Sequence, residues 1–154
     1  MPHEIDTAEC DYYRGEILRF SGLDCVLFSE KESCENWDVL IVDAVGYLSS
    51  LYRLGFAAYV GGGFSKGIHN VLEPTIGEIP VFFGPKHRKF KEAGSLVKIG
   101  GGFEVHSSAE ITSLLQCWLD FPERYSVAGK AAKEYLTSSS GACKIILDTI
   151  ANSE

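Results

Sequence analysis

Residues 58–73 of this chain combine residue types that could hold a phosphate and a ribose. An apolar run ends in three glycines, a cationic loop with Lys66 follows, and then comes a segment with helical spacing that carries Asn70 and Glu73. Glycines let a backbone approach a ligand closely, and the free N–H groups of Ile68, His69 and Asn70 at a helix start would attract an anion. A carboxylate one turn further on can accept hydrogen bonds from two ribose hydroxyls. The spacing therefore predicts a nucleotide site.

A purely structural turn is the alternative to a nucleotide site. A glycine triplet suits any tight connection from a strand to a helix, and Glu73 would then be an ordinary acid of a first helical turn. The triplet alone favours this alternative, whereas the complete arrangement favours the nucleotide.

A second apolar segment, residues 79–83, ends in Gly84 and Pro85 and is followed by a cationic group at residues 86–91. Ligands of open parallel sheets bind beyond the carboxyl ends of the strands, so this segment would lie beside the first one. The cationic group fits a contact with a donor or acceptor phosphate and a solvated helix start equally well.

The elements that position these residues alternate between helix and strand. This alternation predicts an α/β fold with a Rossmann-like parallel sheet and flanking helices, half of a doubly wound sheet. Ser107 or Ser108 would cap a helix whose apolar face carries Ile111, Leu114 and Trp118. We expect helices over residues 11–20, 46–53, 69–77, 89–99, 108–119, 122–136 and 141–151, strands over residues 24–28, 39–42, 56–60, 81–83 and 103–105, and a polar loop over residues 29–37.

Length and composition limit the other function classes. A chain of 154 residues is most simply one domain, residues 1–154. Its net charge of −7 disfavours a general nucleic-acid surface. Five scattered cysteines without CxxC spacing predict reduced thiols, and four histidines without ligand spacing give no metal site. No apolar run reaches the roughly 18 residues that a membrane span needs.

The run GGGFSKGIHNVLEPTIGEIPVFFGPKHRKFKEA, with residues 42–48 upstream, resembles the carboxyl-terminal domain of 3-deoxy-D-manno-octulosonic acid (Kdo) transferases. These GT-B glycosyltransferases move Kdo from CMP-Kdo onto a lipid A precursor in lipopolysaccharide biosynthesis. The resemblance implies a donor-binding domain of such an enzyme, which needs no cofactor. It also implies CMP-Kdo and the lipid A precursor as partners, with the full-length protein at the cytoplasmic side of the bacterial inner membrane.

The same resemblance implies the donor-binding residues. The loop after the glycines would face the phosphate, Glu73 would hold the ribose, and Gly46 would border the cytosine. Family members often carry Thr and Glu or Met where this chain has Ala44 and Tyr47, which leaves backbone contacts from that loop. The family's amino-terminal lobe supplies the catalytic carboxylate, so no catalytic residue is assigned here. The donor-binding set is Gly46, Gly62, Gly63, Phe64, Ser65, Lys66, Gly67, His69, Asn70, Glu73, Gly84 and Pro85.

A difference from the family concerns the start of the donor domain. Residues 1–5 resemble the end of the family's second strand, and the strand-helix-strand unit that normally comes before it is absent. Residues 24–28 would then lack a sequential neighbour, and sheet edges would be exposed. We therefore expect a truncated domain, without the acceptor lobe, that forms a homodimer or swaps strands, binds CMP weakly and does not turn over alone.

Other readings of the motif stay open. Another GT-B sugar-nucleotide enzyme, such as a UDP-sugar transferase or an epimerase, would use a similar glycine loop and ribose acid. A non-catalytic nucleotide-binding module is the second alternative, supported by the absent lobe. The cysteine spacing speaks against a redox or metal protein.

Overall fold

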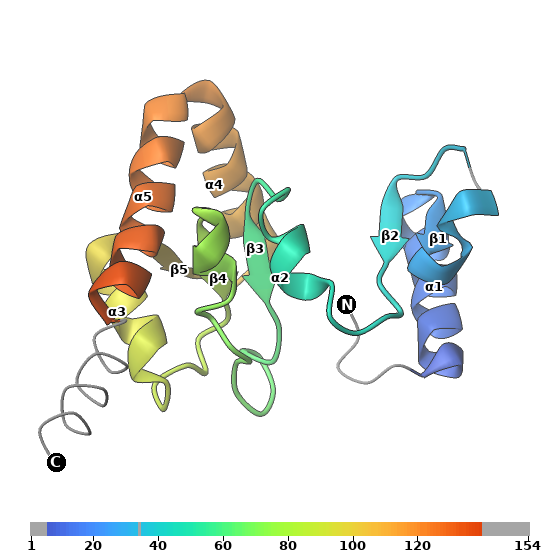
Figure 1. The fold of residues 1–154 in the computed structure, drawn as a ribbon, viewed down its shortest axis with the longest axis horizontal. Helices are drawn as coiled ribbons and strands as arrows, with labels where there is room; N and C mark the ends of the chain where they lie inside the picture. The colour runs from blue at the N-terminus through green and yellow to red at the C-terminus, as the bar shows by residue number, and fades with distance from the viewer. Residues whose placement is uncertain (1–5, 34, 140–154) are drawn as a thin grey trace, which may run out of the picture. The chain divides into compact units, whose positions relative to one another are not determined.

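The structure is a computed structural model that describes residues 6–33 and 35–139 (Figure 1). These residues belong to two compact units, which divide between Leu48 and Ser49. The expected helix over residues 141–151 lies outside the described residues.

The first unit contains one long helix and two short strands. Its elements are α1 (Thr7–Ser21), β1 (Cys25–Leu27), the 3₁₀ helix η1 (Phe28–Ser33) and β2 (Val39–Ile41). Helix α1 begins at Asp6, whose side chain accepts a hydrogen bond from the Ala8 N–H, and ends at Gly22 with φ of 69°. These are the usual start and stop of a helix. The predicted helix and both predicted strands are confirmed, while η1 occupies part of the predicted loop.

Strands β1 and β2 pair in parallel, with Cys25 opposite Val39 and Leu27 opposite Ile41. The expectation that residues 24–28 lack a sequential neighbour is therefore wrong. The segment with η1 between the strands is long enough for the crossover that parallel pairing needs. At the start of the pair, the Asp38 N–H donates to the Asp24 carbonyl and the Asp24 N–H donates to the Asp38 carboxylate, each at 2.9 Å.

The second unit is a three-stranded parallel sheet with helices around it (Figure 1). The strand order is β3-β4-β5, with Val60 opposite Phe83 and Phe83 opposite Glu104. Its elements are β3 (Ala58–Val60), η2 (Pro74–Gly77), β4 (Val81–Phe83), α3 (Lys91–Ile99), β5 (Gly102–Glu104), α4 (Ser108–Asp120) and α5 (Pro122–Ser139), and α2 (Leu48–Leu51) lies at the division between the units.

The central strand β4 is buried on both faces, as a continuous apolar run predicts for a parallel strand. Alternate residues point to opposite faces of a strand, so Val81 and Phe83 pack with Leu96 of α3 and Phe82 packs with Trp118 of α4. The predicted cap at Ser107 and the apolar face of α4, which includes Ile111, Leu114 and Leu115, are confirmed.

The expected α/β class with parallel sheets is confirmed: β1 and β2 pair in the first unit, and β3, β4 and β5 pair in the second. One expected element differs from the structure. The helix expected over residues 69–77 is wrong, because only the 3₁₀ helix Pro74–Gly77 forms there. The side chain of Asn70 accepts a hydrogen bond from the Leu72 N–H at 2.9 Å, which competes with helix formation, and Pro74 cannot donate inside a helix.

Candidate functional site

The glycine loop, residues 61–67, leaves the carboxyl end of β3 as a tight turn. The N–H groups of Ser65 and Gly67 donate to the Gly62 carbonyl at 2.9 and 3.1 Å. Gly62 has φ of 88°, and a Cβ at this position would lie 2.1 Å from the Gly67 carbonyl oxygen. Only glycine fits both the dihedral angle and the space. The turn therefore requires glycine at position 62.

The β4 turn, residues 84–90, packs directly against the glycine loop. A Cβ on Gly63 would lie 2.5 Å from the Gly84 nitrogen, so the two backbones meet without side chains between them. Lys86 adds two hydrogen bonds, from its N–H to the Gly63 carbonyl at 2.9 Å and from its Nζ to the Ser65 carbonyl at 3.0 Å. The glycines at these places serve backbone packing between two loops.

The backbone at residues 68–70 differs from the one predicted for an anion contact. No α-helix begins at residues 68–70, and the His69 N–H donates to the Gly61 carbonyl at 3.3 Å. The expected helix start is therefore wrong at this point, and the His69 amide is engaged within the loop. The side chains of Phe64, Ser65 and Lys66 are exposed at the loop's tip, so a cation and a hydroxyl face solvent there.

Asn70 and Glu73 lie together, as their spacing predicted. The Asn70 Nδ2 donates to the Glu73 Oε1 at 3.0 Å, and the Glu73 side chain is half-buried. Burial, and then the nearby Glu73 carboxylate, raise the pKa of Tyr52. Glu73 thus has one oxygen engaged by an amide and lies near an aromatic hydroxyl that can donate a hydrogen bond.

Gly46 belongs to the first unit and lies in the loop after β2, with φ of 88° and no atom near a Cβ built on it. Asp43 precedes it and accepts hydrogen bonds from the Ser29 N–H at 3.0 Å and the Ser29 Oγ at 2.5 Å. These bonds hold the pKa of Asp43 below its ordinary value. The Tyr47 ring lies 4.7 Å from that of Phe28. The loop after β2 is thus held by one carboxylate and one ring contact.

A cluster that the sequence did not predict lies where β4 and β5 end. The imidazole–carboxylate cluster consists of His87, Glu104 and His106. The Glu104 carboxylate contacts the Nε2 atoms of both histidines, with His106 at 3.0 Å. The His87 hydrogen bond, followed by the charges of both imidazoles, lowers the pKa of Glu104. Ligand spacing along the chain could not reveal this cluster, but the positions at the ends of two neighbouring strands could.

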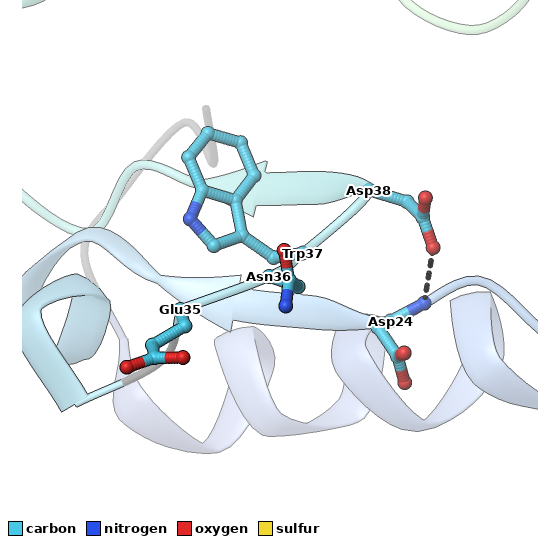
Figure 2. Close-up of a pocket in the computed structure, with 5 residues that line it drawn as sticks. All are labelled: Asp24, Glu35, Asn36, Trp37 and Asp38. Carbon is cyan, nitrogen blue, oxygen red and sulfur yellow. Dashed lines mark hydrogen bonds between the residues drawn. The ribbon is translucent and has the colours of Figure 1, made fainter.

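A hollow of about 400 Å³ in the first unit is lined by residues outside the predicted site (Figure 2). Figure 2 shows the Trp37 ring and the Glu35 carboxylate around it, with the Asp38–Asp24 hydrogen bond at one end. Three acidic side chains and no basic one line this hollow, so it is poorly suited to a phosphate.

Three of the cysteines, and most of the side chains that could bind a metal, lie within the described residues. Cys10, Cys25 and Cys117 are free thiols, and burial raises the pKa of Cys10 and of Cys25. Across residues 6–33 and 35–139, no group of three or more His, Cys, Asp or Glu side chains is placed to hold a metal ion. Within the same residues, no helix is both long and apolar enough to cross a membrane.

The fold defines the class of this protein as α/β, with parallel sheets and flanking helices. It matches the crystal structure described as the C-terminal CMP-Kdo binding domain of WaaA from Acinetobacter baumannii, with a TM-score of 0.69 and 23% sequence identity over 79% of this chain and 65% of that one. No family model matches the chain.

The sequence is homologous to 3-deoxy-D-manno-octulosonic acid transferases, as its motifs predicted. It is 41% identical over 96 residues to the Aquifex aeolicus enzyme, 61% of this chain and 27% of that protein. It is 35% identical over 110 residues to the Chlamydophila psittaci enzyme, 70% of this chain and 25% of that protein. It is also 44% identical over 71 residues to the Chlamydia muridarum enzyme, 45% of this chain and 16% of that protein. The chain thus matches about a quarter or less of each relative's length.

Proposed function

We propose that this chain is the donor-binding part of a glycosyltransferase that transfers Kdo from CMP-Kdo to a lipid A precursor in lipopolysaccharide biosynthesis. The observation that carries this proposal is the 41% identity over 96 residues to a Kdo transferase. The fold match to a domain whose description names CMP-Kdo binding supports it. The acceptor and the catalytic carboxylate would be held by a lobe outside this sequence.

The donor would bind at the carboxyl ends of β3 and β4. The exposed Lys66 ammonium on the glycine loop would offset the charge of the phosphate, including the charge that develops on it as CMP leaves. The Glu73 carboxylate keeps acceptor capacity beyond its Asn70 bond, which suits ribose hydroxyls. Gly63 and Gly84 would act indirectly, by letting the two loops approach each other.

Calorimetric titration of the 154-residue chain with CMP, UMP and UDP tests this assignment. We expect weak binding that favours CMP, and we expect Glu73→Ala to weaken CMP binding about tenfold, because it removes hydrogen bonds to a charged group. Glu92→Ala, which removes an exposed acid in the first turn of α3, is the matched control and should bind as the parent does.

Preference for UDP over CMP would favour another sugar-nucleotide enzyme of the same fold. Equal CMP affinity of the parent and Glu73→Ala would remove the ribose assignment. We also propose that the purified chain does not transfer Kdo by itself, and detection of Kdo transfer to a lipid A precursor would refute this.

Partners beyond the donor form a further part of the proposal. Each parallel sheet has outer strands, and the β3 residue Tyr59 is exposed, so a strand from another copy could pair there. We propose a homodimer through such an edge, and location of the full-length protein at the cytoplasmic face of the inner membrane. Light scattering would test the dimer, and a monomer over the micromolar range would contradict it.

A further inference from the structure

Two imidazoles and one carboxylate meet at the ends of β4 and β5. Glu104 is the last residue of β5 and lies opposite Phe83, the last residue of β4. One of its carboxylate oxygens contacts the His87 Nε2 and the other lies 3.0 Å from the His106 Nε2. A carboxylate can only accept, so each of these nitrogens carries the hydrogen in the contact. Glu104 thus joins side chains from both strand ends.

The His87 ring depends on this contact. The residue is 8% exposed, and its ring lies against Phe83 at 5.0 Å in an edge arrangement. Its Nδ1 is buried and has no hydrogen-bond partner among the described residues. Among the described residues, Glu104 therefore provides the polar partner of this buried ring. Loss of the Glu104 carboxylate would leave both ring nitrogens without a hydrogen-bond partner there. A buried polar group left unpaired is costly, so the ring would move to reach solvent.

Movement of His87 would be passed to the glycine loop. His87 belongs to the β4 turn, and its carbonyl accepts from the Phe90 N–H at 2.8 Å at the start of α3. The turn contacts the loop at three places. These are Gly84 against Gly63, Lys86 against the carbonyls of Gly63 and Ser65, and Phe90, whose ring would lie 3.3 Å from a Cβ on Gly67.

We propose that Glu104 is a positioning residue of the donor site, which holds His87 and thereby fixes the β4 turn and, through Lys86, the glycine loop. This inference rests on the proposed function, because it takes the glycine loop as a donor contact. Glu104 itself would not touch the donor. The ring hydrogen bond carries the effect, so an acceptor oxygen at this position is what the site requires.

A local role fits the exposure of the cluster. The side chains of Glu104 and His106 are 37% and 57% exposed. The Glu104–His106 pair is exposed on both sides and contributes little to the stability of a whole domain. Removal of the carboxylate should therefore loosen the two loops and leave the core of the sheet, around Phe82 and Trp118, as it is.

Three variants of the 154-residue chain test the proposal. Glu104→Ala removes the acceptor, Glu104→Gln keeps an acceptor oxygen for the His87 Nε2, and Glu134→Gln removes an equal charge from an exposed site on α5. We expect Glu104→Ala to bind CMP about tenfold more weakly. Glu104→Gln should bind close to the parent, and Glu134→Gln should not differ from it.

Amide exchange and imidazole nitrogen shifts give a readout that general destabilisation would not produce. Glu104→Ala should speed exchange at Ser65, Gly67 and Lys86 and leave Phe82 unchanged. It should also shift the His87 ring nitrogen signals, and Glu104→Gln should restore them toward the parent pattern.

Unchanged CMP affinity in Glu104→Ala would overturn the proposal. Faster exchange throughout the chain would also overturn it, because that result means a general loss of stability. If the parent chain does not bind CMP, the proposed function fails by itself, and the exchange data still decide whether Glu104 positions the glycine loop.

Discussion

Within each parallel sheet, the segments that follow neighbouring strands are joined, but the two sheets do this in different ways. In the first unit a side chain joins the segments after β1 and β2, since Asp43 accepts two hydrogen bonds from Ser29. In the second unit the backbones themselves meet, because Gly63 after β3 lies against Gly84 after β4. The imidazole–carboxylate cluster then fixes the second of these loops from the side of β5.

This difference shows that glycine can be required after a strand for more than one structural reason. Gly63 and Gly84 allow two loops to touch, whereas Gly46 supplies a positive φ in open space. The resemblance to Kdo transferases implied a donor-binding role for all three glycines. Backbone contact makes the second unit's loops sensitive to any added atom, while the first unit's loop depends on dihedral angle and on one carboxylate.

The largest expected effect comes from adding a methyl group within the glycine triplet. Gly63→Ala would place a Cβ 2.5 Å from the Gly84 nitrogen, and we expect a loss of about 3 kcal/mol in the free energy of unfolding. Gly61→Ala is the matched control, because nothing lies within 4 Å of its Cβ. Urea unfolding followed by circular dichroism measures both variants. Equal stability of the two would contradict the backbone contact.

Removal of the Asp43 carboxylate should have the next largest effect. Asp43→Ala removes two hydrogen bonds to a charged acceptor, and we expect a loss of about 2 kcal/mol confined to the first unit. Amide exchange at Leu27 and Ile41 should rise, while exchange at Phe82 should stay as in the parent. A change of similar size at Phe82 would show that the two sheets do not unfold separately.

Most of the elements could be predicted from the sequence, because apolar runs and helical spacing are local signals. Strand β4 and helix α4, with its Ser107 cap, were predicted within one or two residues. The predicted helix over residues 69–77 does not form, because the Asn70 side chain and Pro74 both compete with helical backbone hydrogen bonding.

The candidate site was predictable only where its contacts are local in sequence. Asn70 and Glu73 lie three residues apart, and their contact follows from that spacing. The pairing of Glu104 with His87 spans 17 residues and depends on which strands are neighbours, which no pattern within either segment records. The order β3-β4-β5 likewise depends on pairing between strands that are distant in the sequence.

A smaller effect is expected at Gly46, which tests the open loop of the first unit. Gly46→Ala adds a Cβ that meets nothing within 4 Å, but the residue must keep φ near 88°. We expect a loss of about 1 kcal/mol from this dihedral angle alone. Gly46→Asn should lose less, since asparagine tolerates positive φ. Thermal unfolding of both variants measures the difference, and equal melting temperatures would exclude the dihedral cause.

The smallest expected effect separates the two carboxylates by their response to acid. The pKa of Glu104 in the folded protein lies below its ordinary value of 4.5, so the unfolded chain binds its proton first as the pH falls. Its contribution to stability is therefore complete above about pH 4.5 and is lost as the pH falls through the lower folded value. Between pH 5 and pH 3, Glu104→Gln should lose less stability than the parent. The difference should be under about 1 kcal/mol, because the Glu104 side chain is 37% exposed.

Asp43→Asn should flatten the dependence of stability on pH at lower pH than Glu104→Gln does, since the ordinary pKa of Asp43 is 3.8. Urea unfolding at half-unit pH steps gives both curves, and parallel curves for the parent and Glu104→Gln would show that the histidines do not stabilise the ionised carboxylate.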